Sequence, residues 1–186
     1  IEADGYMIAM NGLAVYDDYR TGHLLYEAYM SDKAVSFILE RLMREKVFFQ
    51  AYAGNRAYCQ EDRAGLICSC GMDEEHVRFF SGTQKTVADL RAYLSAHRLV
   101  NKFFVSVGDV SQIPFLRVAL NAIEGVVTLS SGEHYIEVIP EGADKRRAVR
   151  AVREAMGLAP EEIMVIGDSE NDLSMIRLAS ASVAMG

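Results

Sequence analysis

The most informative part of this chain is Met164-Val165-Ile166-Gly167-Asp168-Ser169-Glu170-Asn171-Asp172. Its apolar start is typical of a buried strand, and Gly167 permits a tight turn directly after that strand. The flanking sequence predicts helices over about residues 144–156 and 171–179 and a further strand over about 182–185. Helices and strands that alternate with short links form parallel sheets, so this region predicts an α/β fold.

Two carboxylates and an amide follow the predicted strand. Asp168 comes directly after Gly167, and Asn171 and Asp172 open the next helix. Ligands of open α/β sheets bind at the carboxyl ends of the strands, and Mg²⁺ prefers oxygen ligands. Asp168 and Asp172 are therefore candidate metal ligands. A structural interpretation stays open for Asp172, because Ser169 and Asp172 have the spacing of a capping box, but that box explains neither Asp168 nor Gly167.

A second signal is Lys145, which opens the predicted helix over 144–156 and is followed by Arg146 and Arg147. Cations in a first helical turn oppose the helix dipole, whereas a bound anion at that end would make them favourable. Lys145 is therefore a candidate ligand of a phosphate group, and the arginines are interpreted as a solvated basic face. Asn11-Gly12 follows a predicted strand over residues 6–10 and has the composition of a turn.

The remaining sequence predicts alternating helices and strands around one irregular segment. A helix is predicted from Ser31, its expected N-cap, because apolar residues recur at helical spacing as far as Met43. Residues 60–84 carry few periodic apolar residues and are predicted to be a loop. The other predicted elements are a hairpin over 13–29, strands over 47–52, 103–107, 125–129 and 135–139, and helices over 86–97 and 111–123.

The composition excludes several classes of protein. Hydrophobic residues make up 51% of the 186 residues and charged residues 24%, the balance of a globular domain rather than a disordered chain. No uncharged apolar run reaches the roughly 18 residues that a transmembrane helix needs. The dispersed net charge of −7 disfavours nucleic acid and anionic membranes as partners. Three cysteines, at positions 59, 68 and 70, are typical of reduced thiols and a cytoplasmic location.

In this order, Asn11-Gly12, Lys145 and the Gly167-Asp168-Ser169-Glu170-Asn171-Asp172 motif resemble the haloacid dehalogenase (HAD) superfamily, in particular its Cof-type branch (subfamily IIB). All four fixed positions of the family's GDxxND motif are matched. The resemblance covers nearly the whole chain in order and is strongest in its last part. It implies a Rossmann-like core, incomplete here, over residues 1–29 and 133–186. It also implies an inserted α/β cap domain over residues 30–132 that chooses the substrate, with two helices on each side of a small sheet.

The resemblance further implies a Mg²⁺-dependent phosphatase that acts on small phosphorylated metabolites, sugar phosphates or cofactor phosphates, through a phosphoaspartate. In such an enzyme Lys145 would steady the nucleophile and the phosphoryl charge. Asp168 would bind Mg²⁺ directly, and Asp172 would orient water or Lys145. Asn171 would lie near the phosphate, and Asn11-Gly12 would belong to the phosphate-binding and substrate-binding site.

The chain departs from the family pattern in one important respect. The family's first motif, DxDGT, which carries the nucleophile, is absent from these 186 residues. Because the chain starts at Ile1 and stops at Gly186, we expect it to be a piece of a longer protein whose nucleophile lies before Ile1. Without that nucleophile we expect this piece to release no phosphate, and we expect its incomplete sheet to favour self-association.

Two other functions stay open on the sequence. The first is a non-catalytic α/β module that binds a small molecule or regulates a partner, which the missing first motif would favour. The second is a serine esterase, because Gly167-Asp168-Ser169 resembles the first block of the GDSL hydrolases. That block normally lies near the N-terminus with a histidine far downstream, whereas no histidine follows Ser169 here.

Overall fold

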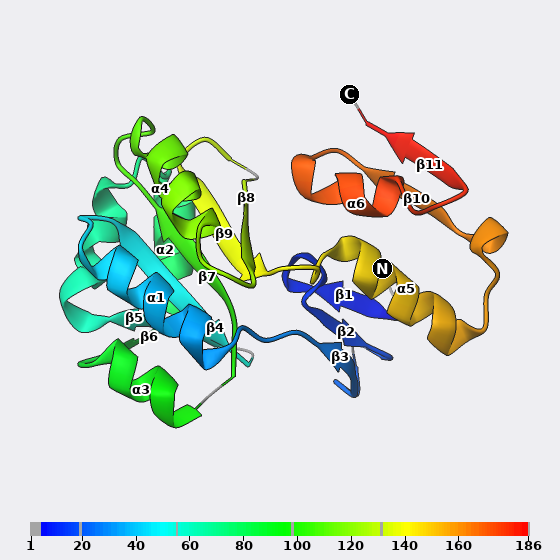
Figure 1. Cartoon of the computed structure of the whole chain (residues 1–186), viewed down its shortest axis with the longest axis horizontal. Helices are drawn as coiled ribbons and strands as arrows, with labels where there is room; N and C mark the ends of the chain where they lie inside the picture. Colours follow the sequence, from blue (N-terminus) through cyan, green and yellow to red (C-terminus); the bar gives the residue numbers. More distant parts are fainter. Residues whose placement is uncertain (1–4, 19, 55, 98, 131, 186) are drawn as a thin grey trace. The chain divides into compact units, whose positions relative to one another are not determined.

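The computed structural model describes residues 5–18, 20–54, 56–97, 99–130 and 132–185. The chain divides into two compact units, which are coloured along the sequence in Figure 1. Unit 1 consists of Ile1–Ala28 and Glu141–Gly186, and unit 2 of Tyr29–Pro140. The two units are described separately below.

The N-terminal part of unit 1 is an antiparallel sheet of three short strands. These are β1 (Met7–Ala9), β2 (Ala14–Tyr16) and β3 (Leu24–Glu27), in the order β1-β2-β3. A 3-10 turn, η1 (Met10–Gly12), connects β1 to β2. The predicted strand and the predicted hairpin are therefore confirmed, and the Asn-Gly pair forms the corner between β1 and β2.

The C-terminal part of unit 1 alternates helices and strands. Its elements are α5 (Lys145–Met156), η3 (Pro160–Glu162), β10 (Met164–Gly167), η4 (Glu170–Asp172), α6 (Leu173–Ile176) and β11 (Ala181–Ala184). Strands β10 and β11 pair in parallel, which confirms the predicted parallel sheet. Helix α6 is shorter than the predicted helix over 171–179. A 3-10 turn precedes it, and the chain closes into a tight turn in which the Leu178 N–H donates to the Met175 carbonyl.

Unit 2 is built on a six-stranded sheet. Its strands are β4 (Phe48–Ala53), β5 (Arg56–Gln60), β6 (Gln84–Val87), β7 (Val100–Ser106), β8 (Val126–Leu129) and β9 (Tyr135–Pro140), in the order β6-β5-β4-β7-β9-β8. Neighbouring strands are antiparallel except β5 and β6. The sequence placed the end of the inserted domain at residue 132, but the division falls after Pro140. Strand β9 belongs to unit 2, because it pairs with both β7 and β8 in the sheet of that unit.

One face of this sheet carries three helices and the larger apolar core. They are α1 (Asp32–Met43), α3 (Leu90–His97) and α4 (Gln112–Asn121). Helix α1 begins where predicted, since the Ser31 side chain accepts the Ala34 N–H at 3.1 Å. Its buried side is Ala34, Val35, Ile38, Leu39 and Leu42, the predicted helical stripe. These side chains pack on fully buried sheet residues such as Phe49 and Phe103.

The opposite face of the sheet carries a 3-10 segment, η2 (Glu61–Ser69), and one helix, α2 (Glu74–Thr83). The predicted loop over 60–84 is therefore wrong. Helix α2 has no fully buried residue, which weakens its apolar pattern, and it starts at Asp73, whose carboxylate accepts the His76 N–H at 2.9 Å. The expected two helices on each side are also wrong, because three α-helices pack on one face and one on the other.

The predicted helix over 86–97 is correct only in its second half. Its first residues, Thr86 and Val87, belong to β6, which pairs with β5. Helix α3 starts after Asp89, whose carboxylate accepts the Ala92 N–H at 2.9 Å. Sheet pairing across the chain therefore overrides the local helical pattern at Val87.

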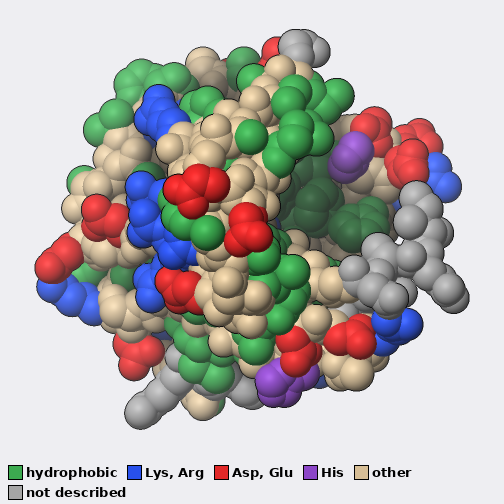
Figure 2. All heavy atoms as spheres, turned by 90° about the vertical axis from the view of Figure 1, so that its right-hand side faces the viewer, with side chains coloured by type: hydrophobic (Ala, Val, Ile, Leu, Met, Phe, Trp, Pro, Cys, Tyr) green, Lys and Arg blue, Asp and Glu red, His purple; other side chains and the backbone are tan. Residues whose placement is uncertain are grey.

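Large apolar side chains remain at the surface of both units, as the space-filling view shows for one face of the molecule (Figure 2). In unit 1 they include Met164, Ile166 and Val183 of the parallel pair β10 and β11. Among the residues described, no helix is both long enough and apolar enough to cross a membrane.

Candidate functional site

The start of α5 and the corner after β1 form the first half of the candidate site. Gly12 has a positive φ of 96°, and a Cβ there would lie 2.5 Å from the Lys145 nitrogen and 2.6 Å from the Asp144 carbonyl oxygen. Only glycine permits this close approach of two backbones. The Asp144 side chain caps α5 by accepting the Arg147 N–H at 3.0 Å. The Asn-Gly turn is thus packed against the first residue of α5.

The second half of the site is the loop after β10. Gly167 ends this strand, and a Cβ at this position would overlap the Cβ of Asp172 and lie 2.7 Å from its Cγ. The Asp172 carboxylate therefore sits directly over the end of the strand. Its Oδ2 accepts the backbone N–H groups of Asp168 and Ser169 at 3.0 and 3.2 Å. The lack of a side chain at Gly167 is what lets this loop fold around Asp172.

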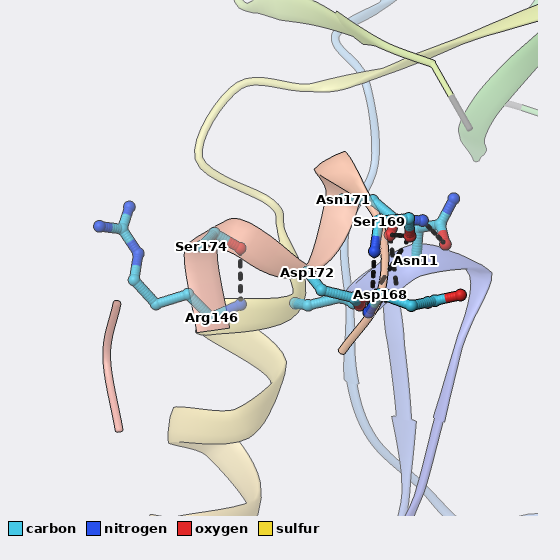
Figure 3. Close-up of polar contacts among 8 residues, drawn as sticks. Asn11, Arg146, Asp168, Ser169, Asn171, Asp172 and Ser174 are labelled. Atoms are coloured by element: carbon cyan, nitrogen blue, oxygen red, sulfur yellow. Dashed lines mark hydrogen bonds and ion pairs between the residues drawn. The ribbon is translucent and has the colours of Figure 1, made fainter. Parts of the chain in front are cut away.

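The two halves meet in a network of hydrogen bonds (Figure 3). The Lys145 ammonium donates to Asp172 Oδ1 at 2.5 Å and to Asn171 Oδ1 at 3.3 Å. The Asn171 amide donates to Asn11 Oδ1 at 3.1 Å. The structure thus brings together Asn11, Gly12, Lys145, Asn171 and Asp172 from three separate parts of the sequence, all within unit 1.

The electrostatics of this network keep Asp172 ionised. Burial by itself raises the pKa of its carboxyl, since the side chain is only 5% exposed. The hydrogen bonds and charge of Lys145, together with the amides of Asp168 and Ser169, more than offset burial and lower the pKa to about 2. The Lys145 side chain is 24% exposed, so its ammonium is held by Asp172 but still reaches the surface.

Asp168 lies differently from Asp172. It is exposed, its backbone N–H points to Asp172, and no hydrogen bond of its carboxylate is found among the described residues. Its carboxylate is a hard oxygen ligand at the carboxyl end of β10, which fits a Mg²⁺ ligand. Both Asp172 oxygens carry hydrogen bonds already. In the part of the chain that the structure describes, no three His, Cys, Asp or Glu residues gather as a metal site, so no complete set of protein ligands surrounds Asp168 there.

The arginines beside Lys145 are not part of the network. The Arg147 guanidinium lies over the Tyr26 ring at 5.2 Å, and the Arg146 side chain points away from the network (Figure 3). The Arg146 backbone N–H donates to the Ser174 hydroxyl at 3.4 Å. The sequence separated Lys145 from the two exposed arginines, and the structure adds that Arg146 and Arg147 have different environments.

Ser169 is the site residue whose role the sequence only half revealed. Its hydroxyl donates to Asn171 Oδ1 at 2.6 Å and contacts Asp172 Oδ2 at 3.2 Å. The capping-box spacing pointed to Asp172 but not to Asn171. An esterase would need a histidine beside this hydroxyl. Unit 1 has one histidine in its sequence, His23, and its ring is paired with Asp17 at 2.7 Å.

A family model described as haloacid dehalogenase-like hydrolase matches residues 1–186. Among curated relatives, 5-amino-6-(5-phospho-D-ribitylamino)uracil phosphatase YwtE of Bacillus subtilis is 24% identical over 195 residues, covering 96% of this chain and 67% of that protein. A haloacid dehalogenase-like hydrolase from B. subtilis has a similar structure, with a TM-score of 0.80 at 19% identity over 99% of this chain and 70% of the other. The structure of a HAD subclass IIB sugar phosphatase is also similar, with a TM-score of 0.73 at 19% identity over 97% of this chain and 64% of the other.

The chain therefore spans about two thirds of the length of these relatives. The family match extends over the whole sequence, and it includes the Gly167 to Asp172 motif at the carboxyl end of β10. The resemblance to the Cof-type branch is confirmed, and the chain belongs to the haloacid dehalogenase-like hydrolases.

Proposed function

We propose that this chain is part of a Mg²⁺-dependent phosphatase for small phosphorylated metabolites, either sugar phosphates or cofactor phosphates. The observation that carries the proposal is the Lys145 ammonium, held by Asp172 and Asn171 at the end of β10 and at the start of α5. The phosphatase names of the relatives support the same class of reaction.

The residues of this chain act by positioning charge. The Lys145 ammonium neutralises the charge of a phosphoryl oxygen. The N-terminus of α5, where Lys145 lies, favours an anion in the same place. Asp172 holds Lys145 in place and stays ionised because its pKa is lowered to about 2. The Asn171 amide, fixed between Asn11 and Ser169, orients the phosphate beside Lys145. Phosphoryl transfer depends mostly on such positioning and charge neutralisation.

Asp168 is the residue of this chain that would hold the metal ion directly. Its exposed carboxylate supplies one ligand oxygen, and further protein ligands come from outside the residues that the structure describes. Bound there, Mg²⁺ supplies further neutralisation of the phosphate charge. Asp172 acts on Lys145 rather than as a ligand, because both its oxygens already accept hydrogen bonds.

The nucleophile is supplied by a segment that this sequence does not contain. No Asp-x-Asp sequence occurs in the 186 residues, so an aspartyl group that forms the phosphoaspartate must come from elsewhere. These 186 residues alone therefore release no phosphate. Unit 2 acts as the cap that chooses the substrate. The cytoplasmic location expected from the cysteines stays a prediction.

Phosphate binding to the chain itself tests the proposal without turnover. Inorganic phosphate, titrated with Mg²⁺ present, should shift the backbone amide signals of Asn11, Lys145 and Asn171 in an NMR spectrum. We expect the Lys145→Ala variant to lose this response and the Arg146→Ala variant to keep it, since the Arg146 side chain points away from the network. A response that survives Lys145→Ala would contradict the assignment of the site.

Turnover provides the second test. The 186-residue chain should release no phosphate from p-nitrophenyl phosphate. A longer form that carries an Asp-x-Asp segment should do so with Mg²⁺, and Asp168→Ala in that form should remove the dependence on Mg²⁺. Phosphate release by the 186 residues, or Mg²⁺-dependent release by the Asp168→Ala form, would overturn the mechanism. Binding without turnover in the longer form would favour the non-catalytic module.

A further inference from the structure

The second face of the sheet in unit 2 is not a continuous apolar surface. Phe48, Cys59 and Phe104 are covered by η2 and α2, but the neighbouring positions on the same face are polar. Tyr52 of β4 lies opposite Lys102 of β7, and Glu137 of β9, which lies opposite Phe104, is the diagonal neighbour that contacts Lys102, so the three form a polar row across adjacent strands. This polar row therefore lies at the centre of the sheet rather than at its edge.

The row contains a buried ion pair. Lys102 and Glu137 contact each other through Nζ and Oε1, and their side chains are only 10% and 9% exposed. The Lys102 ammonium also lies 4.8 Å from the centre of the Tyr52 ring. Burial of such a pair generally stabilises a protein no better than apolar side chains of the same size. Its presence in the middle of an otherwise well-packed sheet therefore calls for a role other than stability.

The hydrogen bonds of the row continue toward the edge of the sheet. The Tyr52 hydroxyl donates to Gln50 Oε1 at 3.2 Å, and the Gln50 amide donates to Gln84 Oε1 at 2.8 Å. Burial, and next the charge of Glu137, raise the pKa of Tyr52 to about 12, so its hydroxyl remains a donor. The donors and acceptors of the row are thus fixed in position before any ligand arrives.

A cavity of about 400 Å³ opens onto this row. Tyr52, Lys102 and Glu137 line it together with aromatic side chains of α2, β7 and β9. Phe80 stacks on Phe104 with ring centres 4.7 Å apart, and the Tyr135 ring is tilted against Phe104 with ring centres 5.1 Å apart. A cavity of this size, with apolar walls and a few fixed polar groups, is typical of a small-molecule site.

The charges around the cavity restrict what it can hold. Its lining includes the carboxylates of Asp73, Glu133 and Glu137, and the basic side chains of the same lining are Lys102, which Glu137 already neutralises, and two histidines, His76 and His134. His76 contacts Asp73 at 2.7 Å. An anionic group would therefore meet an excess of negative charge, whereas a neutral group would not.

We propose that this cavity is a binding site for a neutral, planar heteroaromatic ring. The ring would lie against the aromatic walls, and its polar edge would bond to the Lys102 ammonium and the Tyr52 hydroxyl. The site belongs to unit 2 alone and does not involve Lys145 or Asp168, so it goes beyond the proposed phosphatase activity. Its test is a binding measurement, which does not depend on turnover.

Nicotinamide and nicotinate form a matched pair of probes, because they share one ring and differ in a neutral amide against a carboxylate. We expect nicotinamide to give saturable shifts of the backbone amide signals of β7, β9 and α2, and nicotinate to bind about tenfold more weakly or worse. Glucose, which is neutral but not planar, should give no saturable shift. Absence of nicotinamide binding, or equal or tighter binding of nicotinate or glucose, would overturn the proposal.

Removal of the ion pair separates binding from stability. The double variant Lys102→Met, Glu137→Leu removes both partners, so neither is left as an unpaired buried charge. The protein should therefore keep its melting temperature, while its binding of nicotinamide should weaken about tenfold or more. The matched control is Lys33→Met, Glu124→Leu, which removes an exposed ion pair of the same unit and should leave binding unchanged. A folded double variant that binds nicotinamide normally would contradict the role of the row.

Discussion

Among the described residues, each unit contains a lysine–carboxylate pair that is largely buried, and the two pairs are built differently. In unit 1, Asp172 is shared between Lys145 and the backbone amides of the loop that it stabilises. In unit 2, Lys102 and Glu137 lie on neighbouring strands of a sheet whose shape is already set by apolar packing. The first pair holds the loop after β10 in place, whereas the second lies on a sheet that apolar packing already holds in place.

The apolar cores of the two units explain this difference. Unit 2 has a large buried cluster between its sheet and α1, α3 and α4. Among the described residues, unit 1 buries few apolar side chains, and most of them are short. They are Leu13, Ala14, Val15, Ala143, Ala148 and Val165. Where apolar burial is small, polar contacts hold the structure together with two close approaches, of Gly12 to the backbone at the start of α5 and of Gly167 to the Asp172 side chain. The proposed catalytic site therefore lies in the unit with the smaller apolar core.

The largest expected effect concerns the core of unit 2. Phe103 is fully buried in β7, so Phe103→Ala should cost about 3–5 kcal/mol of unfolding free energy. Val165→Ala in unit 1 removes two methyl groups from a smaller core and should cost less. Urea denaturation followed by circular dichroism compares the two variants. Equal losses would mean that unit 1 also depends on apolar packing.

The largest single contribution to the pH dependence of stability should come from Asp172 in unit 1. Because the pKa of Asp172 is lowered from 3.8 to about 2 by folding, its ionised form stabilises the folded state. This contribution, on the order of 2 kcal/mol, is complete above the unfolded pKa and is lost as the pH falls from about 4 to about 2. Urea denaturation over this pH range measures it.

Matched variants assign that pH dependence. Asp172→Asn should remove this part of it, whereas Asp168→Asn should keep it, since the exposed Asp168 carboxylate is not held by the network. An unchanged pH profile in Asp172→Asn would show that the network does not stabilise unit 1.

A smaller effect compares the N-caps of the two units. Asp144 caps α5 and Ser31 caps α1, each through one hydrogen bond from the side chain to the backbone. Substitution of either by alanine should cost about 1 kcal/mol. The loss should be greater for Asp144→Ala, because its charge also offsets the three cations at the start of α5. Chemical denaturation measures both, and a greater loss for Ser31→Ala would contradict this account.

The smallest effect on stability concerns the surface of β10. Ile166 is 56% exposed, and β10 and β11 pair only with each other among the described strands. Ile166→Lys should change the unfolding free energy by no more than about 0.5 kcal/mol but should reduce the self-association that we expect of this chain. Light scattering at several protein concentrations measures the association.

The control is Phe115→Lys on α4, where the phenylalanine is 75% exposed in unit 2 but lies on a helix without open strand edges. It should leave self-association unchanged. If Phe115→Lys abolishes association and Ile166→Lys does not, the apolar surface of unit 2 is the contact.

The helices and turns that could be predicted from the sequence are those that depend on the pattern of a few neighbouring residues. Helix α1 with its cap at Ser31 and the end of α5 at Met156 were predictable, because periodicity and capping are local properties. Gly167 was predicted to permit a turn after β10, but only the structure shows that its missing side chain leaves room for Asp172. The family motif also predicted Asp168 and Asp172 as metal ligands, which stays a prediction. Helix α2 and strand β6 were missed, because α2 has no fully buried residue and β6 depends on pairing with β5.

Which side chains contact each other across the chain became visible only in the folded molecule. Asn11 and Asn171 are far apart in the sequence, and their hydrogen bond exists because Gly12 lets the β1 corner pack against the start of α5. The same holds for the polar row of unit 2, whose members lie on β4, β7 and β9 and show no common pattern along the chain. Such contacts depend on strand order and on close backbone approach, and neither property is written in any short stretch of sequence.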